Sequence, residues 1–228
     1  MALPGGPSSP GAFPDYRLYL VTSGAGPATV AAASAAAAAG AGVVQVRAKR
    51  LSARDLLDLV LRVADGVASA NPATRVLVDD RADVAHAAMR RGAHVHGVHL
   101  GQDDLPVRSA RDLLGPGALI GLTTGTLDLV RAANDVADVV DYLGAGPYRL
   151  TPTKDSGRPP LGLDGYPPLV EASELPVVAI GDIGPGDVAA LRRTGVAGVA
   201  VVRCVMDAED PGARAAALLD AWADGGVG

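Results

Sequence analysis

Three polar side chains occupy alternate positions in a short run: Gln45, Arg47 and Lys49. In an extended chain alternate residues project to the same side, so this run presents one amide and two cations together. Burying such a set without a partner costs free energy, and an anion with a hydrogen-bonding head group would supply the partner. The alternative is a strand end whose charges meet solvent or neighbouring carboxylates, and the run by itself favours neither interpretation.

Aspartates follow the next two apolar runs. Asp79 and Asp80 end one run, and Asp103 and Asp104 follow the other. Carboxylate oxygens suit Mg²⁺, which takes one or two protein carboxylates and completes its shell with water and substrate phosphate. The alternative is that Asp80 caps a helix and that Asp103 or Asp104 pairs with an arginine. The neighbouring cations favour a Mg²⁺ site beside a pyrophosphate.

Hydroxyl groups occur at two further places. Thr123 and Thr124 end an apolar run, where helix capping is the alternative role. Thr151, Thr153 and Lys154 lie in a segment rich in proline and glycine, which is long enough to form an active-site loop. Two hydroxyls beside a compact ammonium suit a phosphate, and turn formation is the alternative.

The last two apolar runs are followed by Gly181 with Asp182 and by Val202 with Arg203. In α/β barrels the loops after the seventh and eighth strands frequently bind phosphate through free backbone N–H groups. We therefore expect a second phosphate site here, which Arg203 would reinforce.

The histidines and the cysteine are expected to be structural. His94 and His96 precede an apolar run, and His99 lies near its end with the opposite parity, so a zinc site is not favoured. Cys204 is the only cysteine, so no intrachain disulfide can form, and its place after an apolar run suggests a small core residue.

The elements that must position these residues are short apolar runs that alternate with segments of helical period. Strands that alternate with helices pair in parallel, and eight such units predict a single (β/α)₈ TIM barrel, with an open doubly wound sheet as the alternative. The expected strands are Leu18–Val21, Val43–Arg47, Val76–Asp79, Gly97–Leu100, Leu119–Thr123, Tyr142–Ala145, Val177–Ile180 and Gly198–Val202. The expected helices are Thr29–Ala39, Ala53–Ser69, Ala82–Arg91, Val107–Leu114, Leu127–Ala137, Pro168–Ala172, Gly186–Arg193 and Gly212–Trp222.

Composition excludes several classes of protein. Of the 228 residues 49% are hydrophobic and 20% charged, and the net charge is −5, so the chain lacks the signature of disorder. Mild acidity and few aromatic residues argue against nucleic-acid binding. Residues 1–15 lack the features of a signal peptide and are expected to be a flexible leader before a barrel at 16–224. The alanine-rich run at 28–39 is too short to span a membrane, so we expect a cytoplasmic protein.

The motifs Q-V-R-A-K, D-D-R-A-D-V-A, G-V-H-L-G-Q-D-D-L, G-A-G-P followed by T-P-T-K, and A-I-G-D-I together resemble the thiamine phosphate synthase family, from Leu18 to about Val205. The resemblance implies a (β/α)₈ barrel and a Mg²⁺-dependent transferase. Such an enzyme joins a hydroxymethylpyrimidine pyrophosphate to a thiazole phosphate, giving thiamine phosphate and pyrophosphate by a dissociative substitution.

The resemblance also implies a role for each matching residue. Gln45 and Asp79 would contact the pyrimidine, and Asp80 and Asp104 would bind Mg²⁺. The pyrophosphate and its departure would involve Arg47, Lys49, Thr123 and Lys154. The thiazole phosphate would be held by Thr151, Thr153, Gly181, Asp182, Val202 and Arg203.

Four residues depart from the family pattern: Asp79 replaces a common Asn, Gly125 a common His, Asp182 a glycine and Arg203 a common Ser. The thiazole end is the most altered, because a carboxylate beside a phosphate is repulsive unless it turns away. A related thiazole tautomerase and a noncatalytic sensor of thiamine precursors are the alternative functions. The partners implied are small phosphorylated molecules, and the sequence leaves open whether the chain forms a homo-oligomer.

Overall fold

The barrel predicted from the apolar runs is present. The computed structural model describes residues 14–150 and 159–226. Within them the parallel strands close into a barrel in chain order, with β8 paired to β1, so the open-sheet alternative is wrong. The strands are β1 (Leu18–Val21), β2 (Val43–Val46), β3 (Arg75–Asp79), β4 (Gly97–Leu100), β5 (Leu119–Thr124), β6 (Tyr142–Ala145), β7 (Val177–Ile180) and β8 (Gly198–Val201).

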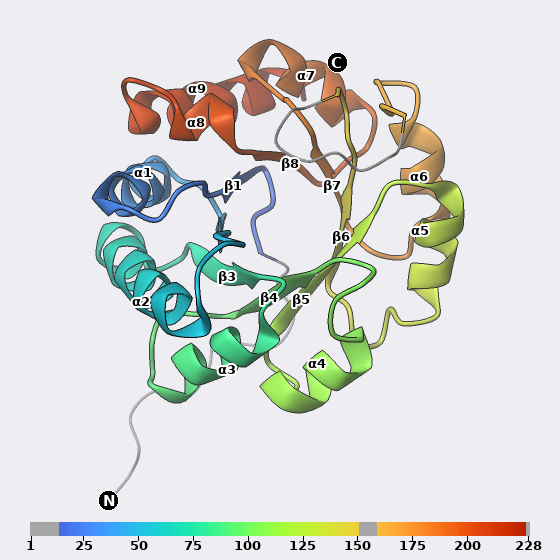
Figure 1. The fold of residues 1–228 in the computed structure, drawn as a ribbon. Coiled ribbons are helices and arrows are strands. Elements are labelled where there is room, and N and C mark those ends of the chain that lie inside the picture. Colours follow the sequence, from blue (N-terminus) through green and yellow to red (C-terminus); the bar gives the residue numbers. More distant parts are fainter. Residues whose placement is uncertain (1–13, 151–158, 227–228) are drawn as a thin grey trace, which may run out of the picture.

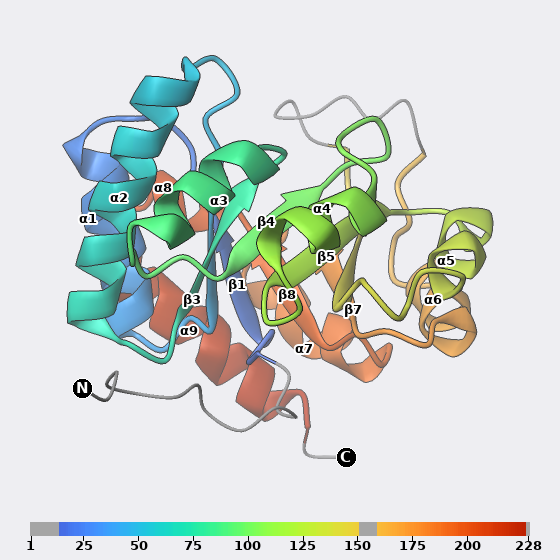
Figure 2. The ribbon, with the colours of Figure 1, turned by 90° about the horizontal axis from the view of Figure 1, so that it is seen from below.

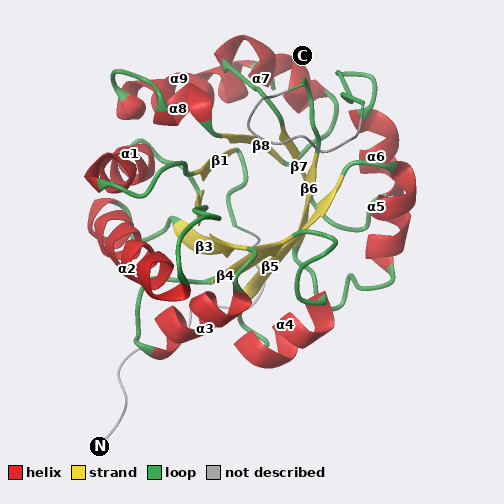
Figure 3. Cartoon of the chain, in the orientation of Figure 1, coloured by secondary structure: helices red, strands yellow, loops and turns green. Residues whose placement is uncertain are grey.

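Helices follow the strands and form the outer layer (Figure 1), which Figure 3 shows as red helices around yellow strands. They are α1 (Pro27–Ala38), α2 (Ala53–Ala70), α3 (Ala82–Arg90), α4 (Val107–Leu114), α5 (Leu127–Asn134), α6 (Tyr166–Ala172), α7 (Pro185–Arg193), α8 (Arg203–Met206) and α9 (Pro211–Asp224).

Most expected helices match the observed ones to within two residues at each end, and two differences are larger. The short helix α8 was not predicted, because four residues are too few to show a helical period. Helix α5 ends at Asn134 rather than Ala137. There the Asn134 amide donates to the carbonyl of Ala172 and accepts from the backbone N–H of Glu174, so its side chain joins the end of α5 to the end of α6.

The alternation of side chains along each strand builds two apolar cores. In β1, Tyr19 and Val21 belong to the cluster inside the barrel, whereas Leu18 and Leu20 belong to the cluster between strands and helices. All four side chains are buried. Because both faces of the strand are covered, its sequence is continuously apolar, as expected for a parallel sheet.

The alanine-rich run forms α1, which packs beside α2 (Figure 2) and also contacts α9. Ala33, Ala36 and Ala37 are fully buried. Small side chains allow the helices to approach closely, and a Cβ atom on Gly66 of α2 would lie 2.5 Å from Oγ of Ser34 in α1. Among the described residues no helix is both long and apolar enough to cross a membrane.

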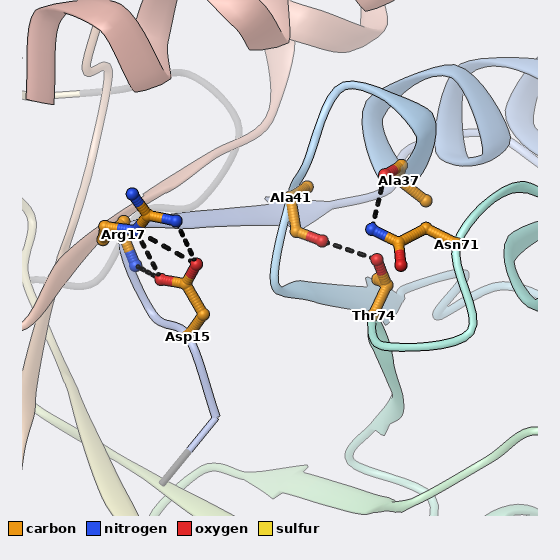
Figure 4. Close-up of polar contacts among 6 residues, drawn as sticks. All are labelled: Asp15, Arg17, Ala37, Ala41, Asn71 and Thr74. Carbon is orange, nitrogen blue, oxygen red and sulfur yellow. Dashed lines mark hydrogen bonds and ion pairs between the residues drawn. The ribbon is translucent and has the colours of Figure 1, made fainter. Parts of the chain in front are cut away.

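Side-chain hydrogen bonds connect the loops at the amino ends of the strands (Figure 4). The Thr74 hydroxyl donates to the carbonyl of Ala41 at 2.7 Å, and the Asn71 amide donates to the carbonyl of Ala37 at 3.1 Å. These bonds join the segment after α2 to the last turn of α1 and to the loop that follows it. The exposed ion pair of Arg17 with Asp15 lies at the same end of the barrel, next to the start of β1.

The close approach of the first chain segment to β8 gives a stability prediction. A Cβ atom on Gly198 would lie 1.5 Å from the backbone oxygen of Tyr16. We expect Gly198→Ala to lower the free energy of unfolding by about 3 kcal/mol or more, because backbone must move to relieve the overlap. Gly186→Ala is the control, since it lies in α7 with nothing within 4 Å of its Cβ, and should be neutral or stabilising by up to about 1 kcal/mol. Equal denaturation midpoints for the two variants would contradict this account.

Candidate active site

A cavity of about 440 Å³ opens where the carboxyl ends of the strands meet. All the predicted site residues that the structure describes line it: Gln45, Arg47, Lys49, Asp79, Asp80, Asp104, Thr123, Gly181, Asp182, Val202 and Arg203. Thr151, Thr153 and Lys154 lie outside the described residues. The fold thus gathers the described side chains in one place, while their individual roles stay predictions.

Both cations after β2 are paired with carboxylates at the end of β3. Arg47 Nε lies 3.3 Å from Oδ2 of Asp79, and Lys49 Nζ lies 2.7 Å from Oδ2 of Asp80. Burial lowers the pKa of Lys49, but the hydrogen bond and charge of Asp80 outweigh it, and the net change is a raised pKa. The lysine therefore stays protonated. Each cation after β2 pairs with a neighbouring carboxylate, which is the alternative that the sequence left open. Both pairs lie on the cavity wall, where a ligand could also reach them.

Asp80 and Asp104 meet across the ends of β3 and β4. Their carboxyl groups are hydrogen-bonded to each other, and Asp104 also accepts from the backbone N–H of Gly101 at 2.6 Å. Burial raises the pKa of Asp80, but the Lys49 hydrogen bond outweighs it, so the net pKa is lowered. Burial and the neighbouring Asp80 carboxyl raise the pKa of Asp104. Each carboxylate therefore makes it harder to ionise the other.

This pair fits Mg²⁺. A divalent cation would offset the repulsion between the two carboxylates, and Mg²⁺ commonly uses one or two protein carboxylates beside water and phosphate oxygens. The capping alternative for Asp80 is wrong, because α3 begins after Arg81 without a side-chain cap. In the part of the chain that the structure describes, Asp104 contacts Asp80 and Gly101 and is not paired with an arginine. Among the described residues no cluster of three or more His, Cys, Asp or Glu side chains is suited to a metal.

Gln45 and Asp79 form the neighbouring part of the wall. Gln45 is 4% exposed, and its backbone oxygen accepts from the N–H of Thr22 at 2.9 Å, which fixes the end of β2 against β1. The Asp79 side chain is 9% exposed and paired with Arg47. A carboxylate therefore stands where the family pattern has a neutral amide, and the guanidinium balances its charge.

His99 is a cavity residue that was considered from sequence only as a zinc ligand. Its Nδ1 lies 2.9 Å from the hydroxyl of Tyr142, and its Nε2 lies 2.9 Å from Oγ1 of Thr123. The signal was present in the strand: Val98 and Leu100 belong to the outer core, so the residue between them must point inside the barrel. Thr123 contacts this imidazole, and the cap of α5 is Thr126 instead.

The other histidines lie away from the cavity. His94 Nε2 is 2.8 Å from the carbonyl of Thr74, and His96 Nδ1 accepts from the backbone N–H of Val76 at 3.1 Å. Burial lowers the pKa of His96 to about 4, so it is neutral at pH 7. Cys204, expected in the core, packs against the core and also lines the cavity. Burial raises the pKa of its thiol, which does not favour a nucleophile.

At the predicted thiazole end of the site, which departs most from the family pattern, two charged side chains pair with each other. Asp182, which has the left-handed φ of 55°, accepts a hydrogen bond of 2.5 Å from Nη2 of Arg203. Gly181 has φ 125°, and a Cβ atom there would lie 2.6 Å from the backbone N of Tyr148, so this position requires glycine. The carboxylate and the guanidinium, each unusual for the family pattern, are thus partners of one another.

Comparison with known proteins agrees with this geometry. A family model described as thiamine monophosphate synthase matches residues 18–205. The chain is 60% identical over 210 residues to a thiamine-phosphate synthase of Corynebacterium jeikeium, covering 92% of this chain and 96% of that protein. It is 55% identical over 213 residues to the thiamine-phosphate synthase of Corynebacterium efficiens, covering 93% and 97%.

A solved structure is similar as well. The thiamine phosphate pyrophosphorylase from Pyrococcus furiosus superposes with a TM-score of 0.79 at 29% sequence identity, covering 94% of this chain and 98% of that chain. The family model spans every strand of the barrel and includes all the residues that line the cavity. The chain therefore belongs to the thiamine monophosphate synthase family.

Proposed function

We propose that this protein joins a hydroxymethylpyrimidine pyrophosphate to a thiazole phosphate and releases pyrophosphate, with Mg²⁺ as cofactor. The observation that carries the proposal is the grouping of Arg47 and Lys49 with the Asp80 and Asp104 carboxyl pair on one wall of the cavity. Two cations beside two acids suit a pyrophosphate that arrives with a divalent metal. An isomerase acting on a thiazole phosphate alone would have no pyrophosphate to expel.

The leaving group is the centre of the proposed mechanism. Breaking the bond between the pyrimidine methylene carbon and the pyrophosphate oxygen transfers an electron pair to that oxygen, so negative charge develops there. Arg47 and Lys49 already lie at this wall and lose little freedom when they bind the pyrophosphate, which is preorganised electrostatic stabilisation. Bound between Asp80 and Asp104, Mg²⁺ would supply further positive charge to the leaving oxygens.

The remaining charge lies on the pyrimidine. Loss of pyrophosphate leaves a methylene cation that the electron-rich aminopyrimidine ring stabilises, and the thiazole nitrogen then attacks this carbon. The buried amide of Gln45 can donate and accept hydrogen bonds at the ring edge, and the Asp79 carboxylate can accept from an amino group. Their role is to hold the ring so that its methylene carbon faces the incoming thiazole.

The thiazole phosphate would occupy the opposite side of the cavity. Gly181 brings its backbone close to the ligand space, and Arg203 offers a cation that Asp182 holds in place. In barrels this region after β7 and β8 commonly binds phosphate. The Asp182 carboxylate points to Arg203, which relieves the repulsion that it would otherwise exert on a phosphate.

The activity itself can be tested with purified protein, both phosphorylated precursors and Mg²⁺. We expect equal amounts of thiamine phosphate and pyrophosphate, and no product when Mg²⁺ is removed with a chelator. Binding of the precursors without turnover would indicate a sensor. Conversion of the thiazole phosphate in the absence of the pyrimidine would indicate a tautomerase. Either outcome, with circular dichroism showing a folded chain, would overturn the proposal.

Asp104→Asn tests the carboxyl pair. The substitution removes one oxygen ligand, and we expect kcat to fall about a hundredfold or more, with a higher Mg²⁺ concentration needed for half-maximal rate. Thermal unfolding should change little, since Asp104 is partly exposed. Asp112→Asn, an exposed position in α4, is the control and should behave as the wild type. An unchanged Mg²⁺ dependence would exclude a ligand role for Asp104.

The two lysines allow a second test, because this chain has 20 basic residues of which only Lys49 and Lys154 are lysine. Lys49 Nζ touches Asp80, and the broader guanidinium of arginine would displace this charge. We expect Lys49→Arg to lower kcat about tenfold or more, and we predict the same for Lys154→Arg. The exposed Arg50→Lys serves as the control. Near-normal turnover in both lysine variants would show that any cation suffices.

A further inference from the structure

Four side chains inside the barrel are joined by hydrogen bonds into a line that ends at the cavity. The hydroxyl oxygens of Tyr19 and Tyr142 are 2.7 Å apart, and the Tyr142 hydroxyl is 2.9 Å from His99 Nδ1. His99 Nε2 is 2.9 Å from Oγ1 of Thr123. All four residues belong to the lining of the cavity, but Tyr19 and Tyr142 are each only 1% exposed, whereas Thr123 is partly exposed. The Tyr19 end of the line is therefore the more deeply buried one, and the Thr123 end is the more open to the ligand space.

The protons available on the four side chains determine which group donates in each hydrogen bond of the line. Each hydroxyl has one proton to donate, and a neutral imidazole has one donor and one acceptor nitrogen. In the described part of the chain the Tyr19 hydroxyl has Tyr142 as its hydrogen-bond partner. If Tyr142 donated to Tyr19, the Tyr19 proton would be buried without an acceptor, which costs free energy. Tyr19 therefore donates to Tyr142.

The direction of this first hydrogen bond sets the donor and acceptor roles of His99 and Thr123. The Tyr142 proton is free to go to His99 Nδ1, so Nδ1 is the acceptor and the ring proton lies on Nε2. The Nε2–H group then donates to Oγ1 of Thr123. Because the Thr123 oxygen accepts from the imidazole, its own proton is directed away from the ring toward the cavity.

The last bond of the line needs a proton on Nε2 and does not depend on the total charge of the ring. A second ring proton, on Nδ1, would leave this bond as it is, because the Nε2–H group would still donate to Oγ1 of Thr123. Only a neutral ring with its proton on Nδ1 would make Thr123 the donor to the imidazole.

We propose that Tyr19, Tyr142 and His99 are positioning residues that fix the Thr123 hydroxyl as a hydrogen-bond donor to the departing pyrophosphate. This role rests on the proposed function. No proton is transferred: the line keeps one hydroxyl proton aimed at the oxygen on which negative charge develops. Burial holds the pKa values of both tyrosines well above their ordinary value, so the two hydroxyls remain protonated donors.

The first test needs neither substrate nor turnover. The ring-nitrogen chemical shifts of ¹⁵N-histidine-labelled protein, measured at mildly alkaline pH, distinguish a protonated from an unprotonated nitrogen, and His99→Gln assigns the signals. We expect a proton on Nε2 of His99. A neutral ring with its proton on Nδ1 would overturn the proposal. A wild-type enzyme without activity would overturn the proposed function, and with it the pyrophosphate acceptor, while the tautomer result would stand by itself.

The second test uses tyrosine variants. Tyr142→Phe should lower kcat about tenfold with the KM of both substrates changed by less than about twofold, since the hydroxyl orients a group that acts in the transition state. It should also weaken the preference for the Nε2–H form. Tyr19→Phe should have a smaller effect in the same direction, and it tests the line if Tyr142→Phe does not fold.

Tyr16→Phe is the matched control. Tyr16 is 4% exposed and its ring lies 4.9 Å from that of Tyr142, yet its hydroxyl has no hydrogen-bond partner in the described structure. We expect Tyr16→Phe to keep the wild-type kcat and the wild-type histidine spectrum. Equal losses in Tyr16→Phe and Tyr142→Phe would show that the tyrosines only pack the barrel, and this outcome would also overturn the proposal.

Discussion

The balance of charge across the ends of β2, β3 and β4 is the constraint on which the site depends. Two cations and three acids meet there on the wall of one cavity: Arg47 pairs with Asp79, Lys49 pairs with Asp80, and Asp104 lies against Asp80. A set of like charges held this closely would be costly, whereas the paired arrangement is stable without a ligand. In the proposed function the same groups would turn to a pyrophosphate and a metal ion, which would replace the protein partners. The closed barrel is what brings three consecutive strand ends into this register.

The fold could be predicted from sequence because the barrel strands are buried on both faces. Each strand then appears as a short apolar run, and the order of runs and helices defines the topology. The site was largely predictable for a related reason, since residues at the ends of consecutive strands must converge. The pairing of each carboxylate with a particular cation was harder to predict from sequence. Whether Asp80 caps a helix or meets Lys49 depends on its left-handed backbone, with φ 61°, which the sequence does not display. The role of His99 was missed because its partners Tyr142 and Thr123 lie on other strands.

Two of the four departures from the family pattern are partners of each other. Asp182 replaces a glycine and accepts a hydrogen bond from Arg203, which replaces a common serine, so this pair adds no net charge to the cavity. Asp79 replaces an amide and pairs with Arg47, which belongs to the family motif, so its added negative charge lies beside a guanidinium. The Asp182 carboxylate is directed to Arg203, so it would not face a phosphate bound at the proposed thiazole end. Pairwise compensation of this kind is invisible in single motifs, because the two residues are separated by a strand and a helix in the sequence.

The central claim is that this wall binds pyrophosphate and Mg²⁺ as one unit. Calorimetric titration of the unmodified protein with inorganic pyrophosphate, in the presence and absence of Mg²⁺, measures this directly. The account predicts one binding site whose affinity for pyrophosphate rises at least about tenfold with Mg²⁺, since each ligand supplies the charge that the other needs. By reciprocity, the affinity for Mg²⁺ must rise by the same factor when pyrophosphate is bound. Equal affinity with and without Mg²⁺, or the absence of pyrophosphate binding to the folded protein, would contradict it.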